Sequence, residues 1–205
     1  MATFGSIEAL ADFVGSLPAR RIVGILGPPA AGKSTIAEAL VAQLPSAIVL
    51  PMDGYHYPQA RLVELGRRER MGAPDTFDVP SFVATLRALR DVHNSCTSVF
   101  APAFDRGIEE PVPDAIEIVQ ELRTVVVEGN YLLLESGGWE SVAPLLDATV
   151  FVRLDRGIRQ QRLIERHVRF GKSPADARSW ALGTDERNAL AIEATAARAD
   201  HWIEL

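Results

Sequence analysis

The 205-residue sequence predicts an α/β fold built on a parallel β-sheet. Short apolar runs alternate along the chain with segments of helical periodicity, as expected for successive βαβ units. One run, Val125 to Val127, is a continuous β-branched segment, which is typical of a strand buried on both faces. The length and the apolar fraction of 47% suit a single globular domain over residues 1–205.

Taken in order, the elements begin with a helix in the first sixteen residues, where apolar side chains recur at helical spacing. The predicted strands cover 21–26, 47–51, 98–101, 115–119, 124–128 and 148–154, and 201–205 is a candidate for a last one. The predicted helices cover 33–44, 59–70, 81–90 and 156–169. Ser173 and Pro174 read as an N-cap and a first helical position, and the helical pattern then runs to about 197 with a break at Gly183.

Composition excludes several classes of protein. The net charge of −6 argues against a nucleic-acid partner, because such proteins need a basic face. No stretch approaches the roughly 20 apolar residues of a membrane helix, so membrane insertion is not expected. The first residues lack the basic start of a secretory signal, and the single cysteine, Cys96, fits a reducing compartment. We therefore expect a cytoplasmic protein.

Residues Gly27 to Ser34 fit the pattern G-x-x-x-x-G-K-[ST] at every fixed position, between a predicted strand and a predicted helix. Glycines let the backbone wrap closely around phosphate oxygens, and the helix N-terminus adds positive potential. Pro28 and Pro29 lack an N–H, so the donors must come from Ala30 to Thr35. This predicts a P-loop for ATP and Mg²⁺, and the expected nucleotide-binding residues are Gly27, Ala30, Ala31, Gly32, Lys33, Ser34 and Thr35. The alternative is an ordinary glycine turn that opens a helix.

Two carboxylates follow strands that should end at the same edge of the sheet. Asp53 comes after the second strand, where it could accept the proton of an attacking hydroxyl. Glu128 ends the strand around Val126, where it could hold Mg²⁺ together with Ser34, or touch the acceptor. The alternatives are a turn or helix-cap role for Asp53 and a solvent-facing strand end for Glu128.

Basic residues cluster on the long helix near 156–169 and just after it. Arg166 and Arg169 lie nearest the turn at Gly171, where mobile arginines could close over ATP and stabilise the transition state. The alternative is a solvated basic helix face. We predict Asp53, Lys33, Arg166 and Arg169 as catalytic residues.

Five further segments follow the P-loop motif in a recognisable order: Pro51 to His56, Arg70 to Asp78, Pro102 to Arg106, Val127 to Tyr131 and Arg162 to His167. Together with the P-loop, they resemble the phosphoribulokinase, uridine kinase and bacterial pantothenate kinase family of P-loop kinases. Within the family, the sequence is most similar to kinases named for fructose transport systems. Position 54 departs from uridine kinases, which usually carry Ser there, whereas Gly54-Tyr55-His56 is closer to the pantothenate kinase pattern. The chain is nevertheless shorter than bacterial pantothenate kinases.

The resemblance implies a P-loop NTPase fold with a five-stranded parallel core sheet flanked by helices and a short arginine-bearing lid at about 162–176. It supports Asp53 as the base, Lys33 and Ser34 on phosphate and Mg²⁺, and Glu128 near metal and acceptor. It implies that His56, Arg106 and Tyr131 face the acceptor, that Asn188 lies near the adenine, and, by analogy alone, a homodimer. From the residues alone, His56 could be a loop histidine and Arg106 a surface ion-pair partner, and the tryptophans Trp139, Trp180 and Trp202 are expected to pack.

The sequence thus predicts an ATP-dependent kinase for a small-molecule hydroxyl acceptor, either a sugar, a nucleoside or a pantothenate-like compound. The alternative is a regulatory ATP-binding protein or ATPase associated with a sugar transport system. A GTPase is disfavoured because no N-K-x-D motif is evident, and a protein kinase because H-R-D and D-F-G are absent.

Overall fold

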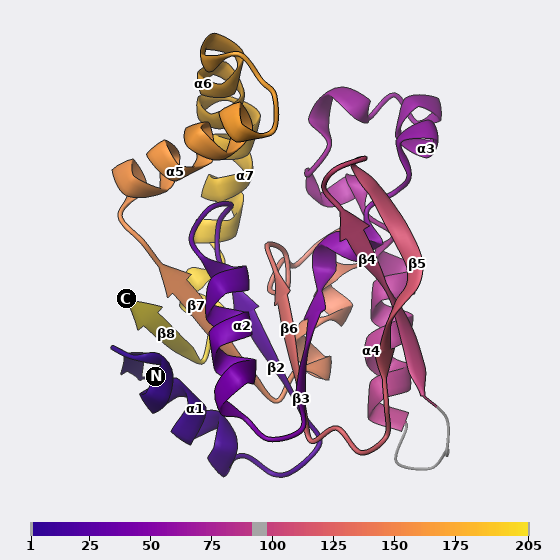
Figure 1. Ribbon diagram of the computed structural model, residues 1–205, viewed down its shortest axis with the longest axis vertical. Helices are drawn as coiled ribbons and strands as arrows, with labels where there is room; N and C mark the ends of the chain where they lie inside the picture. Colours follow the sequence, from indigo (N-terminus) through magenta and orange to yellow (C-terminus); the bar gives the residue numbers. More distant parts are fainter. Residues whose placement is uncertain (1, 92–97, 205) are drawn as a thin grey trace.

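In the computed structural model, which describes residues 2–91 and 98–204, six strands form one parallel sheet in the order β1-β8-β7-β2-β6-β3 (Figure 1). Cys96 lies outside the described residues. The strands of this sheet are β1 (Thr3–Phe4), β2 (Arg21–Leu26), β3 (Ala47–Pro51), β6 (Thr124–Gly129), β7 (Ala148–Arg153) and β8 (His201–Glu204). Strand β2, which leads into the P-loop motif, therefore lies at the centre of the sheet.

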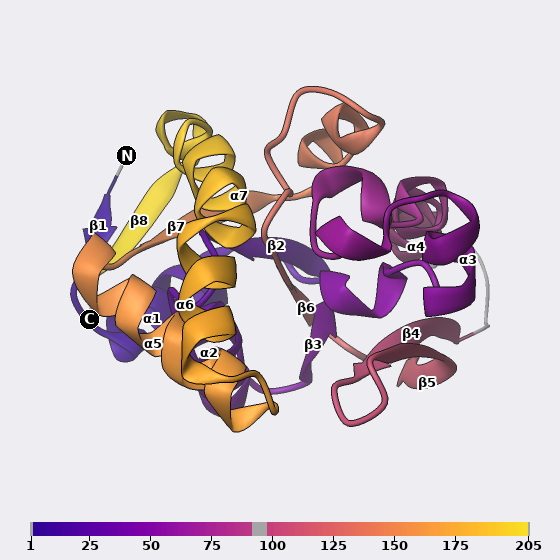
Figure 2. The ribbon, with the colours of Figure 1, turned by 90° about the horizontal axis from the view of Figure 1, so that it is seen from above.

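Helices cover both faces of the sheet (Figures 1 and 2). Their bounds are α1 (Ile7–Ser16), α2 (Lys33–Gln43), α3 (Gln59–Glu64), α4 (Val79–Asp91), α5 (Arg156–Arg169), α6 (Pro174–Leu182) and α7 (Thr184–Glu193). Alternation along β2 separates two hydrophobic layers, because side chains of a strand point to opposite faces in turn. Val23 and Ile25 pack with α1 and α2, whereas Ile22 and Leu26 pack with α4. None of the described helices is long and apolar enough to cross a bilayer.

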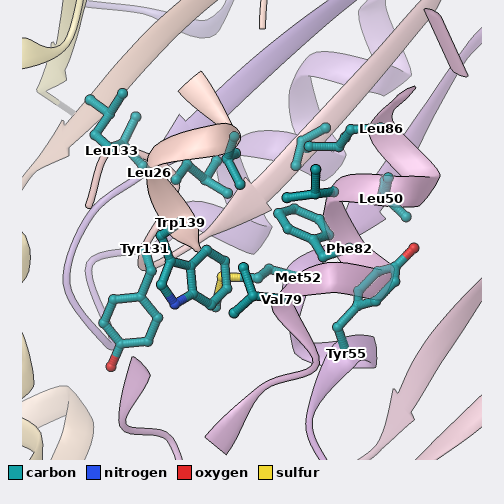
Figure 3. Packing of buried hydrophobic residues seen from close by; sticks show 14 of the residues in the cluster. Leu26, Leu50, Met52, Tyr55, Val79, Phe82, Leu86, Tyr131, Leu133 and Trp139 are labelled. Carbon is teal, nitrogen blue, oxygen red and sulfur yellow. The ribbon is translucent and has the colours of Figure 1, made fainter. Parts of the chain in front are cut away.

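The layer under α4 is rich in aromatic rings (Figure 3). Trp139 is 1% exposed and contacts Phe82 at 5.9 Å and Tyr131 at 5.5 Å between ring centroids. Its indole N–H donates to the carbonyl of Pro74, so the buried polar atom has a partner. Trp139 thus packs as predicted and fixes the segment that precedes α4.

The sheet contains the five predicted core strands and one more. Strand β1 has only two residues, Thr3 and Phe4, which is too short to produce a recognisable alternating pattern. The helix predicted over 59–70 is shorter than expected, because α3 ends at Glu64 and Gly66 adopts a left-handed φ of 63°. The break at Gly183 is confirmed, since α6 ends just before it and α7 begins just after it.

An antiparallel hairpin, β4 (Val99–Asp105) and β5 (Glu110–Ile118), stands outside the main sheet. These are the two short strands predicted at 98–101 and 115–119, and both extend further toward the turn that joins them. The hairpin packs on the short 3-10 turn Met52–Tyr55 that follows β3. A Cβ at Gly54 would lie 2.2 Å from the carbonyl oxygen of Pro102, so this approach requires glycine at position 54. The hairpin is thereby held directly against the residue next to Asp53.

Candidate active site

The P-loop motif folds as a tight loop between β2 and α2. Gly27, Ala30 and Gly32 have φ values of 155°, 64° and 100°, and the N–H of Ala31 donates to the carbonyl of Pro28 at 3.1 Å, which closes the loop tightly. A Cβ at Gly27 would lie 3.0 Å from the carbonyl oxygen of Val152, whereas nothing lies within 4 Å of the Cβ position at Gly32. The loop is therefore tied to β7 at its start and open at the helix N-terminus, as an anion-binding cradle requires.

Lys33 lies in the first turn of α2 and is 8% exposed. Its ammonium donates to the carbonyl of Pro28 at 3.2 Å, which keeps the side chain folded over the loop. Burial lowers the pKa of Lys33, and the carboxylates of Glu128 and Asp53 oppose that effect. A buried cation with carboxylates nearby is suited to receive a polyphosphate, whose charge would replace the lost hydration.

The arginines of α5 lie across a groove of about 370 Å³ from the loop. The lining residues that the sequence predicts are Ala30, Gly32, Lys33, Ser34, Thr35, Arg166 and Arg169, joined by Arg162 and Glu165. Burial and the positive charge of Arg106 lower the pKa of Arg166. Over residues 2–91 and 98–204, no carboxylate lies within ion-pair distance of the Arg166 side chain. Its charge is therefore available to a bound anion.

Asp53 lies at the carboxyl end of β3, in the turn that the hairpin covers. Its Oδ2 accepts a hydrogen bond from Nη2 of Arg106 at 2.7 Å, so Arg106 pairs with Asp53 rather than with its own neighbours in the hairpin. Burial opposes ionisation of Asp53, but His56, Arg106 and Lys33 outweigh it and hold the pKa of this carboxyl below its usual value. Asp53 is therefore ionised at neutral pH and can accept a proton.

Glu128 lies on β6, opposite Pro51 of β3 in the register of the sheet, and is 6% exposed. Burial raises the pKa of Glu128, and the negative charge of Asp53 raises it further, against the attraction of Lys33. Two carboxylates in one site thus differ in proton affinity, because only Asp53 has a guanidinium within 2.7 Å. Glu128 is well placed to gain from a bound cation, which would favour its charged form.

Replacing Glu128 by Gln is expected to stabilise the free protein at pH 7 while the difference vanishes in acid. Because the folded-state pKa of Glu128 is raised, its charged form costs stability at pH values above that pKa. Below the ordinary glutamate value of about 4.3, wild type and variant are both neutral at this position. Thermal unfolding across pH, without nucleotide or magnesium, measures the difference. Glu38→Gln, on the exposed face of α2, controls for the substitution, and a less stable Glu128→Gln protein at pH 7 would contradict the expectation.

The largest collection of predicted residues lines one cleft, of about 180 Å³, beside the loop. Its predicted lining residues are Lys33, Ser34, Asp53, His56, Arg106, Glu128, Arg166 and Asn188. Part of its lining comes from α5, α6 and α7, from residues 68–77, which follow α3, and from the hairpin; Figure 1 shows α5, α6 and α7 on one side of the molecule and α3 with the hairpin on the other. The structure thus brings both carboxylates, the loop lysine and one lid arginine to the same space.

Tyr131, predicted to face the acceptor, does not line the cleft. The Tyr131 ring is 1% exposed within the core, and its hydroxyl donates to the carbonyl of Gly72 at 2.5 Å (Figure 3). It therefore supports the wall of the cleft rather than lining it. Asn188, predicted near the adenine, lies on the side of the cleft that contains Gly72, at 3.4 Å from that carbonyl. Ala31 is 4% exposed and faces the core, although its backbone belongs to the loop.

Sequence reasoning missed several lining residues. They are Arg68, Phe77, Phe104, Glu109, Lys172 and Trp180. Trp180, expected only to pack, lies under the ammonium of Lys172 at 4.6 Å. Phe77 and Phe104 fall inside the segments that resemble the kinase family, which is the one signal that could have indicated them. Arg68 and Glu109 carry no local motif.

Helix α5, which carries the predicted lid arginines, is held by contacts with α7. Nη2 of Arg159 on α5 donates to Glu186 of α7 at 2.7 Å, and both side chains are buried. Nearer the tip, Nε2 of His167 lies 2.6 Å from Oδ2 of Asp185. The region predicted as a lid, residues 162–176, therefore includes the end of α5, the turn at Gly171 and the start of α6, and α7 supports it.

Several relatives of this chain are named as kinases. The chain is 41% identical over 145 residues to the ATP-dependent kinase-like protein notR′ of Aspergillus versicolor, which covers 67% of this chain and 84% of that protein. It is 34% identical over 192 residues to the protein YggC of Escherichia coli K12. That alignment covers 91% of this chain and 78% of YggC. Pantothenate kinases also match, but the chain spans only 48–61% of their length. The chain matches no described protein-family profile.

The fold has a close counterpart among solved structures. A crystal structure from Silicibacter sp. TM1040, described as a candidate fructose transport system kinase, superposes with a TM-score of 0.87 at 33% identity. The match covers 97% of this chain and 99% of the other. Fold and site together define a P-loop phosphotransferase. The chain belongs to the family of P-loop kinases that includes uridine kinases and pantothenate kinases.

Proposed function

We propose that this protein transfers the γ-phosphate of ATP to a hydroxyl group of a small metabolite. The observation that carries the proposal is that Lys33, at the phosphate loop, and Asp53, an ionised carboxylate, line one cleft. A P-loop alone would serve a switch or a motor equally well. A base beside the terminal phosphate is what transfer to a hydroxyl requires in addition.

ATP would bind with its phosphates in the loop and its β- and γ-phosphates near Lys33. Mg²⁺ would be held by Ser34 and, directly or through water, by Glu128, and would offset the charge of the phosphates. The donor set fits this ion: Ser34 and Glu128 bring a hydroxyl and a carboxylate to one cleft, and Mg²⁺ typically takes few protein ligands beside phosphates and water. Glu128, buried with a raised pKa, is a carboxylate that a cation would stabilise.

In the transfer step, the acceptor oxygen attacks the γ-phosphorus and its proton passes to Asp53. The bond between the γ-phosphorus and the bridging oxygen breaks, and ADP leaves with that oxygen. Arg166 and Arg169 would stabilise the charge on the equatorial oxygens from the groove beside the loop. We propose that α5 and α6 act as the lid that brings them in, and that His56 and Arg106 contact the acceptor.

The test is release of ADP with and without a mixed pool of hydroxylated metabolites. A kinase is expected to release ADP faster with the pool, and mass spectrometry should find one compound that gains a phosphoryl group. Release that ignores the pool would instead support the regulatory ATPase, and would overturn the proposal. The homodimer and the cytoplasmic location expected from the sequence stay predictions.

A further inference from the structure

We propose that the acceptor is an uncharged, polyhydroxylated molecule of about monosaccharide size, an inference that rests on the kinase function proposed above. The argument concerns the part of the cleft away from the phosphate loop, here called the acceptor side. Its residues are Asp53, His56, Arg68, Phe104, Arg106 and Glu109.

The two arginines of the acceptor side already have carboxylate partners. Arg106 is 2.7 Å from Asp53, and Arg68 is 3.0 Å from Glu109. An anionic group on the acceptor could bind either guanidinium only by facing or displacing the carboxylate beside it, and bringing like charges together is unfavourable. A hydroxyl can accept from the guanidinium and donate to the carboxylate of the same pair. The paired charges therefore select hydroxyl groups over carboxylates and phosphates.

His56 adds a further hydrogen-bond acceptor. Its Nδ1 lies 2.8 Å from the backbone carbonyl of Asp53, and because a carbonyl can only accept, Nδ1 carries the proton. Burial lowers the pKa of His56, so the ring is neutral at neutral pH and Nε2 is left as an acceptor. Together with the carboxylates of Asp53 and Glu109, this gives the acceptor side an excess of acceptor atoms. A ligand must bring O–H donors to satisfy them.

The aromatic rings and the small volume of the cleft further limit which acceptors can bind. The His56 ring contacts Phe77, which is 2% exposed, at 3.9 Å and Phe104 at 4.9 Å between centroids, and His56 and Phe104 bring ring surface to the acceptor side. Ring faces carry negative potential and attract the C–H face of a sugar. The whole cleft, of about 180 Å³, includes the end that faces the phosphates. It is smaller than the roughly 300 Å³ at which pockets for drug-sized ligands begin, so a compact acceptor fits better than one with an attached base or a long amide chain.

The closing experiment compares three sets of acceptors by the rate of ADP release. The sets are neutral pentoses, hexoses and their alditols, the matching aldonic acids, and the matching sugar phosphates. We expect kcat/KM for a neutral acceptor to exceed that for its acid by about tenfold or more. Preference for an acid, a phosphate, pantothenate or uridine would overturn this inference and leave the kinase assignment standing. If no acceptor increased the release of ADP although ATP binds, both this inference and the proposed kinase function would be overturned.

A variant tests the role of the charge pairs. Glu109→Gln leaves Arg68 without its carboxylate partner and should shift the ratio of kcat/KM toward the aldonic acids. Both side chains are partly exposed, so we expect a shift of roughly two- to fivefold, with the KM for ATP unchanged. Glu64→Gln is the matched control, because Glu64 pairs with Arg61 on α3 outside the cleft. An unchanged ratio in Glu109→Gln would overturn the inference.

Discussion

Replacing Asp53 by Asn is expected to lower kcat by about 10²- to 10⁴-fold, the usual contribution of a general base. The amide keeps the shape of the side chain and can still accept a hydrogen bond from Arg106, whose Nη2 lies 2.7 Å from Oδ2. It cannot take the proton of the attacking hydroxyl. ATP binding should remain near normal, because the phosphate loop does not depend on Asp53. The measurements are steady-state turnover and titration calorimetry with ATP.

Asp12→Asn is the control for this variant, since Asp12 is exposed on α1 and far along the chain from the cleft residues. Turnover close to wild type in Asp53→Asn would remove Asp53 from the role of base. A rise in the KM of the acceptor with kcat unchanged would instead show that Asp53 only holds Arg106 in place. The separation of kcat from KM therefore distinguishes a catalytic residue from a positioning one.

Replacing Lys33 by Met is expected to lower kcat by about 10²- to 10³-fold, as loss of one charged transition-state contact does, and to weaken ATP binding. Methionine preserves the aliphatic stem, which matters because the side chain is only 8% exposed. The variant also removes a buried cation that lies near Glu128 and Asp53. The pKa of Glu128 should therefore rise further.

Arg87→Met on the exposed face of α4 controls for loss of one positive charge. Isothermal titration with ATP measures the binding change, and thermal unfolding verifies that the variant is folded. Unchanged ATP affinity together with unchanged turnover would show that Lys33 does not contact the phosphates and would undercut the assignment of the loop.

The parts of the site that can be predicted from the sequence are those that depend on short, local segments. Gly27 to Ser34 specify the loop locally, and Asp53 follows directly from the rule that parallel strands end at one edge of a sheet. The strands β2, β3, β6 and β7 are equally predictable, since each contains a short run of consecutive apolar residues. These features depend on neighbours in the chain, and a single sequence contains that information.

The contacts that escaped prediction join residues far apart in the chain. Arg106 meets Asp53 only because the hairpin docks on Gly54. The residues around either position do not reveal which distant segment will dock there. Tyr131 was expected in the pocket because its segment resembles a family motif, but the register of the turn after β6 directs its ring into the core. The pair of Arg68 and Glu109 likewise depends on how the 3-10 turn Arg68–Arg70, which follows α3, meets the hairpin tip.

The close approach of Gly54 to Pro102 marks the boundary between two parts of the molecule that should tolerate substitution differently. The nucleotide end is built into the central sheet, where a substitution disturbs the whole core. Part of the acceptor side is carried by a hairpin with its own ladder of hydrogen bonds, which packs on the turn Met52–Tyr55 and on α4. Changes along the exposed length of that hairpin can accumulate at little cost to folding. We therefore expect descendants of such an ancestor to diverge in what they phosphorylate long before they diverge in how they hold ATP.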